Sequence, residues 1–261
     1  MPPSTHPIRI NVDLGESYGN WACGPPTAEL LPYIDHANIA CGFHAGDPLI
    51  MQDTVRACLD SPSKRGPIAL GAHPGLPDLQ GFGRRYMALS PAELTAMTRY
   101  QIGALQGFIS AEEGAPSLHH IKPHGTLYGL TSRDAEACRA VYAAVPAGAR
   151  VFGLAGTAHE AVARELGIPF VAELYADVRW GRDGSLVIER RKGSWEPHET
   201  RQHVGAQVRE GAVTAVTGER VEIPLGEHEV SLCVHSDSPG CMEILKAARE
   251  IVDEFNGAKF G

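Results

Sequence analysis

Residues 37–48 read ANIACGFHAGDP, an apolar run that passes through a polar, glycine-containing turn into a helical pattern. Short apolar runs with such punctuation predict buried strands. The pattern recurs along the chain and predicts seven strands, at residues 8–13, 37–42, 68–72, 119–123, 151–154, 169–174 and 230–235. Helical patterns separate most of them, at residues 47–59, 90–113, 132–144, 157–166, 197–210 and 239–255. This alternation implies right-handed β/α units and a parallel sheet.

Polar residues are distributed over the predicted strand ends as they are in a closed barrel. An open doubly wound sheet gathers them at one switch point, whereas a barrel spreads them over the C-terminal ends of nearly all strands. They follow six of the seven predicted strands, and only the fifth, which runs into GLAGT at 153–157, offers little beyond backbone amides. We therefore predict an α/β fold, a seven-stranded β/α (TIM-like) barrel that spans residues 1–261 as a single domain. We expect the long interval 176–229, with a hairpin turning at Asp183 and Gly184, to cross the barrel mouth or form a partner surface.

The composition of the chain excludes several classes of binding partner. The net charge is -8 and no Lys/Arg cluster tracks a phosphate backbone, which argues against nucleic acid as a partner. No segment approaches the roughly 18 uninterrupted apolar residues of a membrane span. The six cysteines are dispersed without a C-x-x-C pair, and the N-terminal residues do not resemble a signal peptide. We expect a cytoplasmic protein that acts on a small molecule and does not bind membranes.

The turn after the second predicted strand is dense in reactive side chains. Asn38, Cys41, His44 and Asp47 fall within ten residues, and the intervening glycines let the backbone approach a ligand closely. A buried strand thiol explains Cys41 equally well, and a helix cap explains Asp47 equally well. For His44 we favour a functional role.

The third and fourth predicted strands end in further polar segments. Residues 71–85, GAHPGLPDLQGFGRR, form a loop in which Arg84 and Arg85 are suited to hold a carboxylate or phosphate, although a solvated pair that stabilises the loop is an alternative for Arg85. Lys122 and His124 lie two residues apart and therefore on one face of a strand, where a cation and an imidazole reach the same substrate. A surface lysine beside a core histidine is the alternative interpretation.

Carboxylates gather at the same predicted edge. Asp13 and Glu16 follow the first strand, and Glu173 and Asp177 follow the sixth. In a partly desolvated barrel mouth their pKa values are pushed apart, which suits general acid/base chemistry. A divalent metal is left open, because the residue types of a catalytic metal site are present without a recognised spacing, at Asp13, His44, His73, His124 and His235. The chain has neither a P-loop nor a dinucleotide-binding fingerprint.

Five segments together resemble the LamB/YcsF family: NVDLGESYGNW, ANIACGFHAGDP, GAHPGLPDLQGFGRR, YQIGALQ and KPHGTLY. The resemblance implies a barrel like that of glycoside hydrolases and polysaccharide deacetylases. It also implies the conversion of 5-oxo-L-proline, ATP and water to L-glutamate, ADP and phosphate, with ATP shared with separate B and C subunits. The matching positions are Asp13, Glu16, Asn38, Cys41, His44, Asp47, His73, Asp78, Arg84, Arg85, Lys122, His124 and Tyr128. The chain departs from the family pattern at Val178, Trp180 and Ser236, so another lactam or cyclic amide is a further candidate substrate.

These observations predict a set of site residues. We expect catalytic roles for Asp13, Glu16, His44, His73, Lys122, His124 and Glu173, and substrate binding by Asn38, Asp47, Arg84, Arg85, Tyr128, Asp177 and His235. Phosphorylation of the lactam oxygen would create a leaving group, after which water attacks. Two alternatives remain: a metal-dependent amidase or deacetylase on the same barrel, and a non-catalytic ligand-binding subunit of a complex.

Overall fold

Parallel strands form a closed barrel at the centre of the computed structural model, which describes residues 4–61, 65–189 and 192–261. The strands are hydrogen-bonded in the order β1, β2, β3, β4, β5, β6, β9 and back to β1. Their bounds are Ile8–Leu14, His36–Ala40, Ala69–His73, His120–Ile121, Arg150–Gly153, Phe170–Tyr175 and Glu229–Val234. Every neighbouring pair in the barrel is parallel. The predicted seven-stranded α/β barrel is confirmed.

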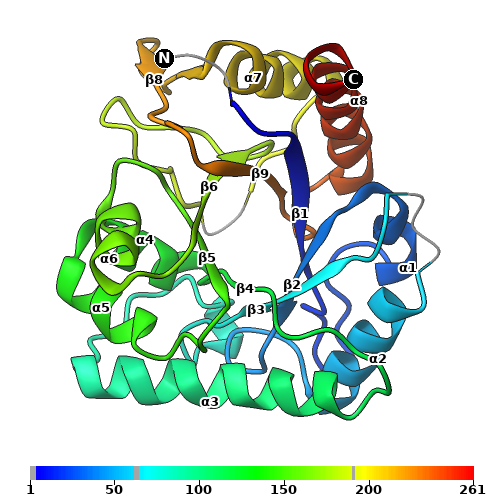
Figure 1. Cartoon of the computed structure of the whole chain (residues 1–261), viewed down its shortest axis with the longest axis vertical. Helices are drawn as coiled ribbons and strands as arrows, with labels where there is room; N and C mark the ends of the chain where they lie inside the picture. Colours follow the sequence, from blue (N-terminus) through cyan, green and yellow to red (C-terminus); the bar gives the residue numbers. More distant parts are fainter. Residues whose placement is uncertain (1–3, 62–64, 190–191) are drawn as a thin grey trace.

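Helices surround the barrel and connect its strands (Figure 1). The α-helices are α1 (Thr27–Leu30), α2 (Pro48–Leu59), α3 (Pro91–Ser110), α4 (Gly125–Arg133), α5 (Ala135–Tyr142), α6 (Ala158–Leu166), α7 (Pro197–Glu210) and α8 (Cys241–Phe260). Two 3-10 helices, η1 (Leu31–Tyr33) and η2 (Leu79–Gly81), lie in the connections. Among the helices of the described residues, none is long and apolar enough to cross a membrane.

The predicted helix at 132–144 is wrong in its extent. The chain instead forms α4, which begins at Gly125, and α5, and the break between them is Asp134. Asp134 has an extended backbone and its carboxylate accepts hydrogen bonds from the backbone N–H groups of Glu136 and Ala137, so it caps α5. Leu127 is buried in α4, and its burial stabilises the helix over this segment.

The long interval after β6 also holds more structure than predicted. The hairpin-like turn at Asp183 and Gly184 is present, with a bridge between Trp180 and Leu186. The last two residues of that predicted hairpin, 190–191, lie outside the described residues. After α7 the chain adds a two-stranded antiparallel sheet, β7 (Ala212–Thr214) and β8 (Arg220–Glu222), which was not predicted.

The barrel closes where the first and last strands of the chain meet. β1 pairs with β9 from Ile8 opposite Val230 onward. The carboxamide of Asn256 in α8 accepts from the N–H of Ile8 at 2.9 Å and donates to its C=O at 2.8 Å. One side chain thus ties the last helix to the start of the barrel.

Replacement of Asn256 by Ala should lower the free energy of unfolding by about 1–2 kcal/mol, because it leaves both backbone groups of Ile8 without this partner. The measurement is urea denaturation followed by circular dichroism. The matched control on the same helix is Glu250→Ala, which removes an exposed ion pair with Arg201 and should cost less than about 1 kcal/mol. Equal losses in the two variants would contradict the assignment.

Candidate active site

A cavity opens at the C-terminal ends of the barrel strands. Its floor comes from strand-end residues and its wall from the segment after β6. The polar and aromatic residues that line it include Asp13, His73, Arg84, Lys122, His124, Tyr128, Tyr175, Asp177, Lys192, Trp195 and His235. The wall also includes Leu186 to Glu189. The segment after β6 therefore crosses the barrel mouth, as predicted.

The ammonium of Lys122 is the most deeply buried cation of the cavity floor. Its Nζ donates to Asp13 Oδ1 and to Cys233 Sγ, each at 2.8 Å, and lies 3.7 Å from Glu173 Oε1. Burial alone would lower the pKa of Lys122, but Asp13, Cys233 and Glu173 outweigh it and hold that pKa well above its usual value. Lys122 therefore remains charged at neutral pH and acts as a fixed positive charge.

Asp13 connects this ammonium to the neighbouring imidazoles. Its Oδ1 also accepts from Asn38 Nδ2 at 2.7 Å, and its Oδ2 lies 3.3 Å from His73 Nε2 and 3.8 Å from His235 Nε2. Burial favours the neutral acid, but the neighbouring His73 and the charge of Lys122 prevail and place the pKa of Asp13 well below its ordinary value. Asp13 is therefore a carboxylate in the folded protein.

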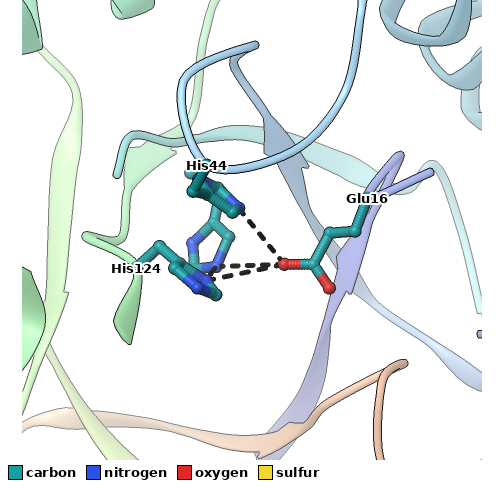
Figure 2. A group of neighbouring side chains, drawn as sticks. Glu16, His44 and His124 are labelled. Carbon is teal, nitrogen blue, oxygen red and sulfur yellow. Dashed lines mark hydrogen bonds and ion pairs between the residues drawn. The ribbon is translucent and has the colours of Figure 1, made fainter. Parts of the chain in front are cut away.

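Glu16 lies against a cluster of three histidines. Figure 2 shows its side chain directed toward His44 and His124. Glu16 Oε1 is 3.3 Å from His44 Nε2, 3.5 Å from His124 Nδ1 and 3.9 Å from His73 Nε2. Burial, together with the charge of Asp13, raises the pKa of Glu16 to about 7, whereas burial lowers the pKa of His44 to about 3 and that of His124 well below its usual value.

The rim of the cavity carries paired charges. Asp177 Oδ1 is 2.8 Å from His235 Nδ1, and its Oδ2 is 3.5 Å from Lys192 Nζ. Asp237 pairs with Arg84 at 2.7 Å and with Lys192 at 2.9 Å. Burial opposes ionisation of Asp177, but Lys192 and His235 lower its pKa below the ordinary range. An anionic ligand at this rim would meet Arg84 and Lys192 in competition with their present partners.

The structure brings most of the predicted site residues together. Eight of them line the cavity: Asp13, His73, Arg84, Lys122, His124, Tyr128, Asp177 and His235. Three more, Glu16, His44 and Glu173, contact those residues from behind.

Three predicted residues lie elsewhere. Asn38 is buried below the cavity, where it donates to Asp13 and accepts from His120 Nε2 at 2.7 Å. Asp47 caps α2 by accepting from the backbone N–H groups of residues 49 and 50, as the alternative interpretation held. Arg85 pairs with Asp78 within its own loop and is half exposed. None of the three lines the cavity, because each side chain is directed into a local structural contact.

Other contributors were not selected from the sequence. Asn11, Tyr175 and Cys233 contact the buried charges: Asn11 Nδ2 and Tyr175 Oη donate to Glu173. A strand alternates its faces, so Asn11 shares a face with Asp13 and Cys233 shares one with His235. That two-residue spacing was an available signal. For Lys192 the sequence offered no such signal, because its place at the rim depends on how a long loop folds back.

Comparisons with known proteins cover the whole barrel. A model of the LamB/YcsF family matches residues 8–259. The lactam utilization protein lamB of Emericella nidulans is 55% identical over 261 residues, all of both chains. The A subunit of 5-oxoprolinase from Thermus thermophilus is 42% identical over 252 residues, 95% of this chain and 96% of its own. A crystal structure of the lactam utilization protein from Thermus thermophilus matches with a TM-score of 0.80 and 40% identity, covering 95% of this chain and 97% of that one.

Replacement of Lys122 by Met should lower the free energy of unfolding by about 3–5 kcal/mol, since it leaves the buried Asp13 and Glu173 without their cation. Chemical denaturation at pH 7 measures this. Arg139→Met is the control, because it removes an exposed ion pair with Glu165 and should cost less than about 1 kcal/mol. A loss at Lys122 no larger than the control would show that the ion pair contributes little.

Proposed function

The chain belongs to the LamB/YcsF family, and we propose that it is one subunit of an ATP-dependent lactam hydrolase that opens 5-oxo-L-proline to L-glutamate. The observation that carries the proposal is the cavity floor, where a permanently charged lysine, an ionised carboxylate and buried imidazoles meet at the strand ends. Relatives that match over nearly their full length are named as the A subunit of 5-oxoprolinase or as a lactam utilization protein, which supports the assignment.

The chemistry requires activation of a poor electrophile. A lactam amide resists attack by water, and transfer of the γ-phosphoryl group of ATP to its oxygen turns that oxygen into a leaving group. One water then adds to the ring carbon, and the ring C–N bond breaks as the nitrogen takes up a proton, which leaves an acyl phosphate. A second water hydrolyses this acyl phosphate, so that L-glutamate, ADP and phosphate are the products. The protein must supply a base for water and positive charge for the oxygens.

The geometry supports separate roles for the residues of the floor. Lys122 stays protonated because its high pKa keeps it charged, so it stabilises negative charge rather than accepting a proton. His44 and His124 are both neutral at pH 7 because burial lowers their pKa values, so either His44 or His124 is proposed to transfer the proton. Asp13 is the carboxylate of the floor that lines this space, with Glu16 and Glu173 behind it, and Arg84 at the rim is suited to the substrate carboxylate or a phosphate.

Substrate choice is expected to depend on the cavity wall. Val178, which departs from the family pattern, lines the cavity, and Trp180 is buried behind it. Ser236 donates from Oγ to Glu16 Oε2 at 3.2 Å. One of these differences lines the cavity and another contacts Glu16, so we include other small lactams such as 2-pyrrolidinone among the substrates to be tested.

We propose that the reaction takes place in the cytoplasm and that it requires partner subunits. All six cysteines are free, which suits a reducing compartment. The sequence has no P-loop to cradle a triphosphate, so ATP is expected to be held jointly with B and C subunits. Relatives that are named as one lettered subunit of 5-oxoprolinase support such a complex.

Activity is expected to depend on the partner subunits. The chain alone should release no phosphate from ATP with any lactam, and activity should appear on mixing with the B and C subunits. Phosphate release and L-glutamate formation are measured with 5-oxo-L-proline and 2-pyrrolidinone. Lactam-stimulated phosphate release by the purified single chain, lost in Asp13→Ala, would contradict the shared site. Activity of the complex that survives Asp13→Ala would favour a non-catalytic role for this chain.

His124 lines the cavity and is expected to be needed for turnover. Its replacement by Ala should reduce turnover of the assembled complex at least about a hundredfold, a typical general acid/base contribution. His228→Ala is the matched control, because His228 precedes β9 at the opposite end of the barrel and pairs with Glu160. Circular dichroism checks that both variants fold. Equal turnover in the two variants would remove His124 from the chemistry.

A further inference from the structure

Two imidazole nitrogens face each other in the histidine cluster with no hydrogen between them in the neutral rings. His73 Nδ1 lies 2.7 Å from the carbonyl oxygen of Lys122, and His124 Nε2 lies 2.8 Å from the carbonyl oxygen of Phe82. A carbonyl oxygen only accepts, so both of these ring nitrogens carry the hydrogen. The remaining nitrogens, His73 Nε2 and His124 Nδ1, then present lone pairs to each other at 2.9 Å. Such an approach requires a positive charge at or between the two nitrogens.

The charges around the histidine cluster also indicate that a positive charge is missing there. The buried carboxylates Asp13, Glu16 and Glu173 face one buried ammonium, Lys122, which leaves two negative charges without a cation when all are ionised. The rim charges do not correct this, because the carboxylates of Asp177 and Asp237 already pair with Arg84 and Lys192. A divalent cation would neutralise the excess.

We propose that His73 Nε2, His124 Nδ1 and Glu16 Oε1 bind a divalent transition-metal ion. Two ligands about 2.0–2.1 Å from a tetrahedral ion lie about 3.3–3.4 Å apart. The three ligand-to-ligand distances are 2.9 Å between the histidines, 3.5 Å from His124 to Glu16 and 3.9 Å from His73 to Glu16. Shifts of about half an ångström bring these atoms to the required spacing. A metal-bound histidine ordinarily donates its other N–H to a carbonyl or carboxylate, as both rings do here.

His44 has a different part in this site. Its ring stacks on that of His124 with centroids 3.8 Å apart and planes within 3°. Parallel rings cannot both direct in-plane lone pairs at one ion, so His44 is a positioning residue rather than a ligand. Its Nε2 is placed to donate to Glu16 Oε1 at 3.3 Å and orient that carboxylate (Figure 2). Among the described residues, its buried Nδ1 has no hydrogen-bond partner.

A second group of metal-ligand types lies nearby and is already occupied. Asp13, Cys233 and His235 approach one another closely enough to hold an ion. The Nζ of Lys122, however, lies 2.8 Å from both Asp13 Oδ1 and Cys233 Sγ. An ammonium therefore takes the place of a metal there, and the metal site is confined to the Glu16 cluster.

The imidazole ligands favour a first-row ion such as Zn²⁺ over Mg²⁺ or Ca²⁺, which prefer all-oxygen sites. Since His73 and His124 also line the cavity, the bound ion would face the substrate space. The metal site goes beyond the proposed lactam hydrolysis, and its test needs neither ATP nor the partner subunits. The two proposals can therefore fail independently.

The experiment uses the isolated full chain, stripped with a chelator and dialysed. Co²⁺ is added and its visible absorption recorded, and Zn²⁺ binding is measured by titration calorimetry. We expect one equivalent of each ion to bind, a d–d absorption band, and a Zn²⁺-dependent rise in Tm. His124→Ala and Glu16→Gln should each weaken Zn²⁺ binding at least about tenfold.

Two further variants serve as controls for metal binding by surface histidines. His228→Ala and His198→Ala should retain the wild-type affinity, since one side chain pairs with Glu160 and the other is exposed on α7. If either cluster variant fails to fold, the Tm rise and the Co²⁺ spectrum of the wild-type chain remain as readouts. Substoichiometric binding without a Tm shift would overturn the proposal and favour a proton as the missing charge. Unchanged affinity in folded His124→Ala and Glu16→Gln variants would overturn it as well.

Discussion

The ion pair between Lys122 and Asp13 is the constraint around which the barrel interior is arranged. An ammonium out of water costs several kcal/mol unless it is fully paired, so the surrounding strands must supply charge and hydrogen bonds to it. Asp13 comes from β1, Glu173 from β6 and Cys233 from β9, while Lys122 follows β4. Strands from opposite sides of the barrel are thus tied at one point. The same pair orients Asp13 toward His73 and so connects the core to the cavity.

Charge is divided unevenly between the rim and the floor of the cavity. At the rim, the carboxylates of Asp177 and Asp237 are matched by Arg84 and Lys192. On the floor, carboxylates outnumber the ammonium of Lys122, and burial prevents water from screening them. Burial and the nearby charge of Asp13 raise the pKa of Glu16 and give the floor its affinity for positive charge, whether a proton or a metal ion carries it. The unbalanced negative charge is therefore concentrated in the floor, whereas the charges of the rim are paired.

The wall of the cavity is built separately from its floor. The floor residues stand at the ends of barrel strands, whose positions are fixed by backbone pairing on both sides. The wall comes from the segment after β6, in which the Arg179 guanidinium lies 4.7 Å above the Trp195 ring. Departures from the family pattern at Val178 and Trp180 fall in this segment. A loop tolerates substitution more readily than a strand, so the wall is where substrate preference can change without loss of the floor.

The sequence by itself determined the barrel, because each apolar run ends in polar residues and most strands alternate with a helix. It also determined which side chains meet at the mouth, since the ends of parallel strands converge, and thus Asp13, Lys122 and His124 were found. Only the tertiary structure decided that Asp47 caps a helix, that Arg85 pairs within its loop, and that Lys192 reaches the rim. The position of a strand end follows from the regular backbone geometry of β/α units, and the alternation of apolar and polar residues in the sequence reveals that geometry. The direction of a loop side chain depends on contacts between residues far apart in the chain, which no local pattern encodes.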